Sequence, residues 1–310
     1  MNTEVLKIRS TIYETIDRFL KSKNFCEIAP PIITSFSCEV ACVGGSDLIS
    51  VNYYDRKAYL TQSGQLYLEA LAMQLGQVYC ISPTFRAEST SLASHLSEFW
   101  MCEAEMIDIT FERLIENIND LLLAVLNSLL EKNSSDLKCL GINVNKIESI
   151  SRGPFIQVSY SDAIEILKQE RFSVKWGDDI KSSHEKILSN YFNEFPIIIT
   201  RYPKALSSFY KQLCPQDQTV TLSFDVIAPN GYGELASGSM RENDVQKLRE
   251  SLLPQVEISP YEWYFNLIAK NQKEHGGYGI GIERLLSWLC NLSTIQDAIP
   301  FPRTKETLCP

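Results

Sequence analysis

Apolar residues recur at helical spacing in two long stretches of this chain. In the first stretch they are Val5, Ile8, Ile12, Ile16 and Phe19. In the second, within residues 111–131, they are Ile115, Ile118, Leu122, Val125 and Leu129. Each series predicts a helix with one buried face. Asn24 is a candidate end signal for the first helix, and Pro30 and Pro31 open an extended segment after it.

Two β-favouring runs surround a polar loop in residues 78–106. Residues 78–85 are largely apolar, and residues 98–106 alternate apolar and polar positions, so the two runs are expected to pair as a hairpin with a long loop. This pairing points five side chains toward one pocket: Arg86, Glu88, His95, Glu98 and Phe99. Together they offer a cation for phosphate, acceptors for an amino group and a ring for stacking. A solvated hairpin explains any one of them alone, but not the whole set.

The remaining segments are less informative. Residues 132–146 are polar and predict a surface loop, whereas residues 155–220 mix short strands and helices without a linker. Residues 276–281 carry four glycines and precede an apolar segment, 285–292, that predicts a helix. A glycine-rich string by itself is weak evidence for phosphate binding.

Composition restricts the class of protein. With 310 residues, of which 45% are hydrophobic and 22% charged, the chain can bury a sizeable core. No apolar run approaches the roughly 20 residues that a membrane helix needs, and the N-terminus lacks a secretory signal, so we expect a cytoplasmic protein without membrane contact. Nine cysteines without a Cys-x-x-Cys pair indicate reduced thiols, with Cys38 and Cys42 as the nearest pair. The net charge of −9 argues against an extended surface for a polyanion, although acidic charge also serves solubility alone.

The string from Pro83 to Met106 resembles motif 2 of the class II aminoacyl-tRNA synthetases, in detail the asparaginyl type. Further segments match the family in order: motif 1 at about 9–34, residues 60–69, residues 224–242, motif 3 at about 276–292, and a closing tail at 299–303. The resemblance implies an α+β fold with an antiparallel β-sheet flanked by helices, in a single catalytic domain spanning 1–310. It also implies a homodimer built on the first helix and strand.

The aspartyl and asparaginyl enzymes carry an N-terminal oligonucleotide-binding barrel that grips the anticodon. Because motif 1 begins within the first ten residues here, we expect a catalytic core alone, similar in this respect to the archaeal asparagine synthetases. Extended binding of tRNA is then disfavoured, while contact with its acceptor end stays open.

By resemblance, the ATP site contains Arg86 on the α-phosphate, Arg284 and His95 on the γ-phosphate, Phe99 on adenine and Glu88 on its amino group. Asp225 and Glu234 would hold Mg²⁺, which suits hard oxygen ligands. Adenylate formation needs no general base, since the attacking carboxylate is already ionised at neutral pH. Arg86 and Arg284 are therefore the catalytic candidates, acting through position and charge. In the same view, the glycines at 276–281 form a strand that lets ATP approach the backbone.

The amino-acid site is expected to contain Glu39, Ser63 and Gln65 on the α-ammonium group and Arg241 on the side-chain oxygen. Aspartyl enzymes place a lysine where this chain has Leu68, whereas asparaginyl enzymes have an apolar residue followed by a glutamate that accepts from the amide nitrogen of the substrate, as in Leu68-Glu69. A second carboxylate buried beside Glu69 without that lysine would be costly, so these residues favour an amide side chain.

Three positions depart from the family pattern. Ser94 stands where the motif 2 loop normally has arginine, Val40 replaces a glycine, and residues 237–240 vary a glycine-rich run. Loss of the loop arginine removes a contact expected at pyrophosphate or the tRNA end.

Four hypotheses for function follow. The first is activation of asparagine or aspartate with ATP, and transfer to an acceptor other than a conventionally recognised whole tRNA. The second is an asparagine synthetase that uses aspartate, ATP and ammonia, and the third is a truncated asparaginyl-tRNA ligase. The fourth is a non-catalytic regulator that binds an amino acid, which Arg86, Glu234 and Arg284 argue against because a binding module needs no metal–ATP site.

Overall fold

An eight-stranded sheet forms the centre of the molecule in a computed structural model that describes residues 2–37, 47–87, 95–252 and 256–309. In spatial order the strands are β1 (Cys26–Glu27), β5 (Gln77–Phe85), β6 (Glu98–Ile107), β13 (His275–Gly281), β12 (Gly233–Met240), β11 (Ser223–Ala228), β8 (Ile197–Thr200) and β7 (Ile156–Ser159). All neighbours are antiparallel except the edge pairs β1–β5 and β7–β8. The structure thus confirms the α+β class and the antiparallel sheet.

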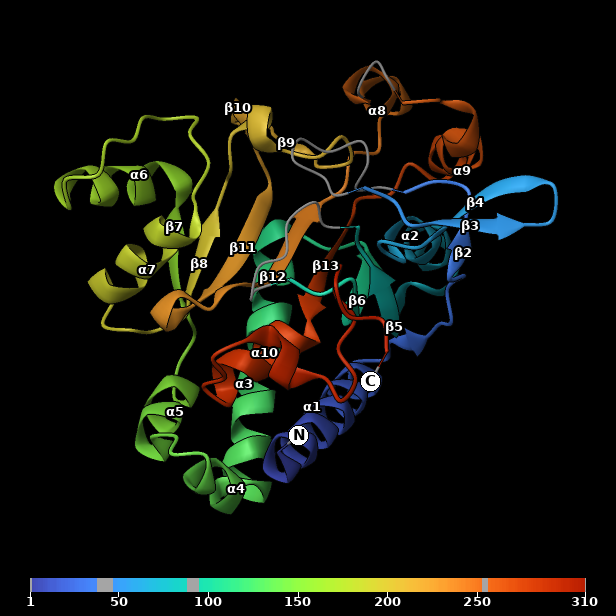
Figure 1. Cartoon of the computed structure of the whole chain (residues 1–310). Helices are drawn as coiled ribbons and strands as arrows, with labels where there is room; N and C mark the ends of the chain where they lie inside the picture. Colours follow the sequence, from blue (N-terminus) through green and yellow to red (C-terminus); the bar gives the residue numbers. More distant parts are fainter. Residues whose placement is uncertain (1, 38–46, 88–94, 253–255, 310) are drawn as a thin grey trace.

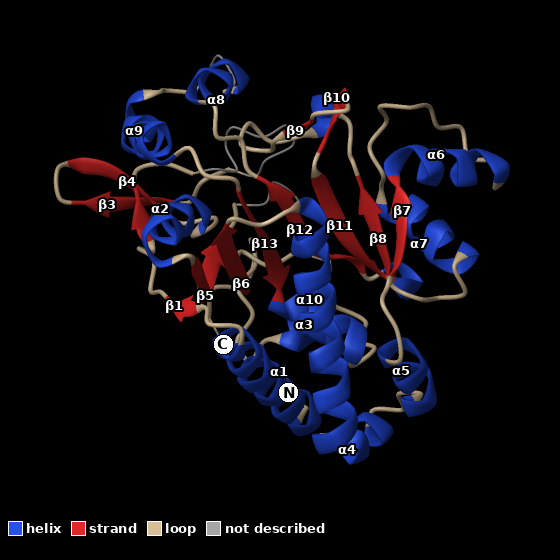
Figure 2. Ribbon diagram, turned by 180° about the vertical axis from the view of Figure 1, so that it is seen from behind, coloured by secondary structure: helices blue, strands red, loops and turns tan. Residues whose placement is uncertain are grey.

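Helices surround the sheet (Figures 1 and 2). They are α1 (Thr3–Ser22), α2 (Gln65–Leu75), α3 (Phe111–Lys132), α4 (Ser134–Cys139), α5 (Val144–Ser151), α6 (Tyr160–Gln169), α7 (Ser182–Tyr191), α8 (Val245–Ser251), α9 (Glu262–Asn271) and α10 (Ile282–Leu289). Small strands complete the described part: β2 (Ile33–Thr34), β3 (Ser50–Tyr53), β4 (Arg56–Leu60), β9 (Leu213–Cys214) and β10 (Asp217–Thr221).

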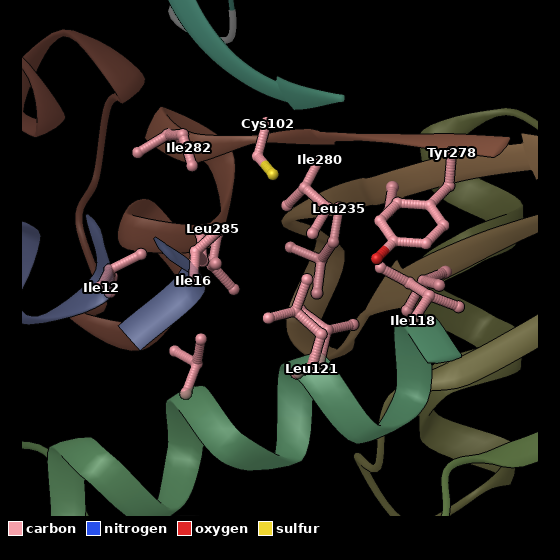
Figure 3. Close-up of a cluster of buried hydrophobic side chains, with 14 of the residues drawn as sticks. Ile12, Ile16, Cys102, Ile118, Leu121, Leu235, Tyr278, Ile280, Ile282 and Leu285 are labelled. Atoms are coloured by element: carbon pink, nitrogen blue, oxygen red, sulfur yellow. The ribbon is translucent and has the colours of Figure 1, made fainter. Parts of the chain in front are cut away.

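One face of the sheet carries the main hydrophobic core. Residues of α1, α3 and α10 pack there against strand residues such as Cys102 and Ile280 (Figure 3). Side chains alternate across a strand, so the odd-numbered residues of β6, including Glu103 and Glu105, face away from this core. The opposite face of the sheet is therefore left for polar chemistry.

Both long helices predicted from periodicity are present, as α1 and α3. The apolar stripe of α1 is buried within this chain by packing on α3. The α1 helix begins at an Asn2 side chain that accepts the N–H of Glu4 (2.9 Å), a capping arrangement that satisfies an otherwise free donor. Asn24 follows its end with a φ of 64°, as a terminating residue does.

The prediction of a surface loop at 132–146 was wrong. This segment contains α4 and the start of α5, and Leu137 of α4 is completely buried in the main core. One buried apolar side chain in a polar segment is too weak a periodic signal to indicate a helix. Tertiary contacts, including Lys7 to Asp136 (3.2 Å), hold this segment against α1.

The seven cysteines in the described residues are all free, and four of them are buried, in agreement with the expectation of reduced thiols. Cys38 and Cys42 lie outside the described residues. Within the described ranges, no helix is both long and apolar enough to cross a membrane.

Candidate active site

Two adjoining cavities open on the polar face of the sheet. The first, of about 170 Å³, is lined by residues that include Arg86, His95, Phe99 and Arg284. The second, of about 230 Å³, is lined by residues that include Ser63, Gln65, Glu105 and Arg241. Four residues line both cavities: Arg86, Met101, Glu234 and Gly279. The two halves of the expected site thus lie side by side, with Arg86 at their junction.

The β5–β6 hairpin supplies one wall of the first cavity, as the sequence predicted. Thr84 pairs with Phe99, and the N–H of Arg86 donates to the carbonyl of Ser97 (3.0 Å). The Arg86 guanidinium lies 5.3 Å from the centroid of the Phe99 ring. Pairing across the hairpin therefore fixes both side chains at the mouth of the long loop.

Two buried nitrogens in this cavity are unsatisfied. Nε of Arg86 and Nδ1 of His95 have no hydrogen-bond partner in the part of the chain that the structure describes. An unpaired buried donor is costly, so both nitrogens are suited to a polar ligand. Glu98 does not contribute to the lining given by the described residues, and its backbone pairs with Arg303 instead. Glu88 and Ser94 lie outside the described residues.

Helix α10 brings Arg284 to the first cavity from the other side. The Glu283 carboxylate accepts from the Trp100 N–H (2.8 Å) and pairs with Arg9 (2.7 Å), which fixes the start of the helix. Gly233, at a φ of 83°, lies directly beneath Arg284, because a Cβ there would be 3.0 Å from Nη1. Only glycine combines this conformation with so close an approach.

Three carboxylates gather near Arg284: Glu185 of α7, Asp225 of β11 and Glu234 of β12. Burial raises the pKa of Glu185 to about 7, with Arg284 opposing that rise and Asp225 adding to it. Glu234 lines both cavities, where water reaches it although protein surrounds it on most sides. This partial burial raises its pKa to about 7, Asp225 adds to the rise, and Arg284 opposes it.

Two of these carboxylates, Asp225 and Glu234, carry oxygen donors of the type that a hard cation takes. Mg²⁺ is usually held by one or two protein carboxylates together with substrate phosphates, so Asp225 and Glu234 fit that role. Among the described residues, no group of three or more His, Cys, Asp or Glu side chains has the geometry of a complete metal site. A metal bound here would therefore depend on further ligands from the substrate.

The start of α2 and strand β6 form one wall of the second cavity. The Ser63 hydroxyl donates to the Glu103 carboxylate, which also accepts the Gly64 N–H (2.8 Å). Gln65 lines the cavity, and its Nε2 donates to Glu69 (2.8 Å). Ser63 and Gln65 are thus at the cavity, as expected, and Glu39 lies outside the described residues.

Glu69 occupies a deeper position than its predicted role suggests. It is completely buried and does not form part of the cavity lining; it accepts from Gln65 and from the Tyr264 hydroxyl (2.6 Å), and its Oε2 lies 3.1 Å from Nε2 of His275. Burial alone would raise the pKa of Glu69, but the hydrogen bond and charge of His275 and the charge of Arg241 lower it below its ordinary value. Glu69 therefore anchors Gln65 from behind the cavity wall.

Arg241 is held at the second cavity by Glu105. Its Nε donates to that carboxylate (3.3 Å), its Nη2 forms a second bond with it, and its Nη1 donates to the Ser239 hydroxyl (2.8 Å). The guanidinium also lies 5.1 Å from the Tyr210 ring centroid. Burial raises the pKa of Glu105, and Arg241 opposes that rise. Paired in this way, Arg241 is preorganised toward the cavity.

The glycines of β13 serve two purposes. Gly279 and Gly281 line the first cavity, in keeping with close approach of a ligand. Gly277 instead makes room for Glu105, whose carboxyl group would collide with any Cβ at that position, and Gly276 packs against Leu114 and Met240. The interpretation that this strand admits a ligand thus applies to half of its glycines.

Several site residues were missed by sequence reasoning. Glu103 and Glu105 continue the period-two series of Phe99 and Met101, and extending that series along β6 would have found them. Tyr264, His275, Glu185 and Lys211, the last of which lines the second cavity, had no local signal. Leu68 packs in a small core cluster with Val78 and Cys80 and does not line the second cavity.

The fold and the two joined cavities define an ATP-dependent ligase of the aminoacyl-adenylate type. The chain belongs to the family described as tRNA synthetases class II (D, K and N), whose model matches residues 1–305. It is 39% identical to an asparagine–tRNA ligase of Desulforamulus reducens, over 96% of this chain and 68% of that protein. It is 38% identical to the same enzyme of Pelotomaculum thermopropionicum, over 99% and 70%.

Solved structures agree with this assignment. The asparaginyl-tRNA synthetase of Pyrococcus horikoshii, complexed with asparaginyl-adenylate, superposes with a TM-score of 0.94 at 33% identity, covering 99% of this chain and 70% of that one. The asparaginyl-tRNA synthetase of Entamoeba histolytica, in complex with asparaginyl-adenylate, gives 0.87 at 30% identity, covering 99% and 68%. An aspartyl tRNA synthetase of Entamoeba histolytica gives 0.83 at 25% identity, covering 100% and 60%.

Proposed function

We propose that residues 1–310 act as one catalytic unit that activates asparagine with ATP, forming asparaginyl adenylate and pyrophosphate. The observation that carries this proposal is the position of Arg86 between the two cavities. An adenylate joins an amino acid to a nucleotide through the α-phosphate. A cation at the junction is therefore where a molecule spanning both cavities needs it.

In the reaction, a carboxylate oxygen of asparagine attacks the α-phosphorus of ATP. The bond from that phosphorus to the bridging oxygen breaks, and pyrophosphate leaves with the electron pair. No proton has to move, so the side chains act by positioning and by charge. Arg86 would hold the α-phosphate, and Arg284 and His95 the γ-phosphate.

Phe99 would stack on adenine in the first cavity, and Glu88 would accept from its amino group. Asp225 and Glu234 would hold Mg²⁺, which neutralises charge on the phosphates when bound. The carboxylates near Arg284 support this assignment: burial is the main cause of the raised pKa values of Glu185 and Glu234, and the charge of Asp225 adds to both, as expected for oxygens close enough to share a cation.

The second cavity would receive the amino acid. Ser63, Gln65 and Glu39 would bind its ammonium group, Arg241 its side-chain oxygen, and Glu69 would act from behind Gln65. Asparagine is favoured over aspartate because Leu68 supplies no lysine, and because Glu103, Glu105 and Glu234 line the cavity. A further carboxylate in this acidic setting is disfavoured. The identity to two asparagine–tRNA ligases also supports this choice.

The acceptor is proposed to be engaged only at the site, as a small nucleophile or a tRNA acceptor end, not as a whole tRNA across a wide surface. A net charge of −9 supports this, since polyanion affinity depends on clustered Lys and Arg.

A homodimer is also proposed, formed over the exposed apolar residues Ile32, Ile33 and Tyr53. Light scattering after size exclusion tests it, and a monomeric mass would contradict it.

The activation step is tested by amino-acid-dependent exchange between ATP and pyrophosphate, with each standard amino acid in turn. We expect exchange with asparagine and a rate at least about 100-fold lower with aspartate, because a buried unpaired charge is strongly penalised. Preferred exchange with aspartate, together with asparagine formation from ammonium chloride, would replace the proposal with an asparagine synthetase. Absence of exchange with every amino acid would refute activation. Adding unfractionated tRNA or hydroxylamine to the preformed adenylate then identifies the class of acceptor.

A further inference from the structure

His275 lies completely buried behind the second cavity, and both of its ring nitrogens face oxygen atoms that accept hydrogen bonds. Nδ1 lies 2.9 Å from the Lys273 carbonyl oxygen, and Nε2 lies 3.1 Å from Oε2 of Glu69. A neutral imidazole carries only one N–H. It would therefore leave one nitrogen lone pair pointing at an oxygen lone pair, in a place that water does not reach.

Two arrangements avoid this conflict: a doubly protonated His275 or a protonated Glu69. The Tyr264 hydroxyl lies 2.6 Å from the same Oε2, and the Nε2 of Gln65 donates to Oε1. Donors thus converge on both oxygens of Glu69, as they do on a carboxylate. The geometry favours an ionised Glu69 and a cationic His275.

Charge balance supports the same arrangement. His275 faces Glu69 on α2 and the nearby Glu105 on β6. Glu69 in turn faces Arg241 after β12 and Tyr264 on α9, among the described groups. Glu105 is held ionised by its two-point pair with Arg241, which it neutralises, so the charge of Glu69 is left over and a protonated His275 cancels it. Burial alone would lower the pKa of His275, but the hydrogen bond to Glu69 raises it above its ordinary value. A buried charge persists only when it is paired.

The consequence reaches the cavity through Gln65. Because its Nε2 donates to Glu69, the amide oxygen of Gln65 points away from Glu69, and it has no hydrogen-bond partner among the described residues. Gln65 lines the second cavity. Its amide oxygen is therefore available to accept a hydrogen bond from a ligand.

We propose that His275 is a positioning residue for the amino-acid substrate, whose cationic ring fixes the ionised Glu69 and thereby holds the amide oxygen of Gln65 available to the substrate ammonium group. The proposal rests on the proposed function for the identity of the ligand. When His275 loses its second proton to solvent as the pH rises, Glu69 stays ionised but lacks its cationic partner, and its carboxylate turns toward the donors that remain, Tyr264 and Arg241. Glu69 Oε1 then no longer fixes Nε2 of Gln65, and the Gln65 amide oxygen is no longer held toward the substrate.

The protonation state is tested directly by NMR of the free protein labelled with ¹⁵N-histidine. The chain has three histidines, and a His275→Gln variant assigns one signal by its loss. At pH 6.5, the ordinary histidine value, the imidazolium pattern is expected to predominate at the His275 nitrogens, because the pKa of His275 is raised above that value. A neutral-tautomer pattern at this pH would overturn the proposal, whatever the enzyme activates.

The effect on substrate binding is tested by the KM for asparagine in pyrophosphate exchange, compared with the KM for ATP. His275→Gln keeps a donor toward Glu69 without a titrating proton, and His275→Leu removes the donor. His184→Gln is the matched control, since His184 lies on α7 and contacts the Lys181 N–H. The Leu variant should raise the KM for asparagine at least about 10-fold, the effect of one lost hydrogen bond to a charged group, with the KM for ATP unchanged.

The pH profile separates positioning from a structural role. In the wild type, the KM for asparagine should rise above the pKa of His275, in addition to the titration of the substrate ammonium group. In the Gln variant, the KM for asparagine should change with pH only through the titration of the substrate ammonium group. At pH 7 this KM should remain within about 3-fold of the wild-type value, as expected for a retained hydrogen bond. The same profile in both proteins would refute the proposal. If the wild type shows no exchange with asparagine, the proposed function fails, while the NMR result still decides the state of His275.

Discussion

Arg241 and Glu105 form a buried two-point ion pair that passes over Gly277. The strand register explains this geometry, because Ser239, Gly277 and Glu105 lie opposite one another on β12, β13 and β6. With no side chain on the middle strand, the Glu105 carboxylate reaches across it to the guanidinium. A glycine outside the lining of both cavities thus sets the position of the arginine that faces the second cavity.

Replacing Gly277 by alanine should disrupt this pair. A Cβ there would overlap the carboxyl group of Glu105 and the backbone oxygen of Ala104, and separating a buried ion pair typically costs about 3–5 kcal/mol. We expect that loss in the free energy of unfolding measured with urea, and a sharp rise in the KM for asparagine. Gly153→Ala is the control, since nothing lies within 4 Å of a Cβ at that position. Equal stability of the two variants would show that the backbone of β13 shifts to accommodate the new Cβ without moving Glu105.

The elements predicted well from the sequence are those whose signals are local and repeated. Helices α1 and α3 follow from stripes that extend over about four turns, and the β5–β6 hairpin from alternation around a polar loop. The side chains placed at the ATP cavity, such as Arg86 and Phe99, belong to one contiguous string. Short-range periodicity is sufficient in these cases.

The network behind the amino-acid cavity could not be predicted in this way. Glu69 and His275 lie 206 positions apart, and Tyr264 reaches the same carboxylate from another helix. Their proximity depends on how β13 and α9 pack on α2, which no local pattern specifies. Glu69 was therefore expected at the cavity surface, although it lies one layer behind.

Arg86→Ala should abolish asparagine-dependent pyrophosphate exchange while leaving the fold intact. Arg86 lies at the junction of the two cavities, and loss of a positioned charge at a phosphate typically reduces a rate by about 10³-fold or more. The control is Arg113→Ala, because Arg113 is exposed and its one ion pair among the described residues is with the neighbouring Glu116. Exchange rates and circular dichroism of both variants provide the measurement. Retained exchange in Arg86→Ala would place the α-phosphate contact elsewhere.

Gly233 and Gly231 allow a matched test of the position of Arg284. Both have a φ of 83°, so alanine at either position should cost about 1–2 kcal/mol of stability through backbone strain. Only at Gly233 would the new Cβ approach Arg284, at 3.0 Å from Nη1, whereas at Gly231 it meets Lys186 at 3.7 Å. We expect similar losses of unfolding free energy, but a raised KM for ATP in Gly233→Ala alone. A raised KM for ATP in both variants would assign the effect to backbone strain.

Glu185 should make the protein less stable as the pH rises. Its pKa is about 7 in the folded protein against 4.5 as the ordinary value, so the folded state holds the proton more tightly. The stabilisation from this group is complete below about pH 4.5 and is lost as the pH rises to about 7, by at most about 3 kcal/mol.

Glu185→Gln mimics the protonated form at every pH. Its free energy of unfolding should match that of the wild type near pH 4.5 and exceed it near pH 8, as measured by urea denaturation at each pH. Taking the difference between the two proteins removes the opposite trend from carboxylates with lowered pKa values, such as Glu14 and Asp136. A constant difference across this range would mean that Glu185 is already ionised in the folded state, compensated by the nearby Arg284.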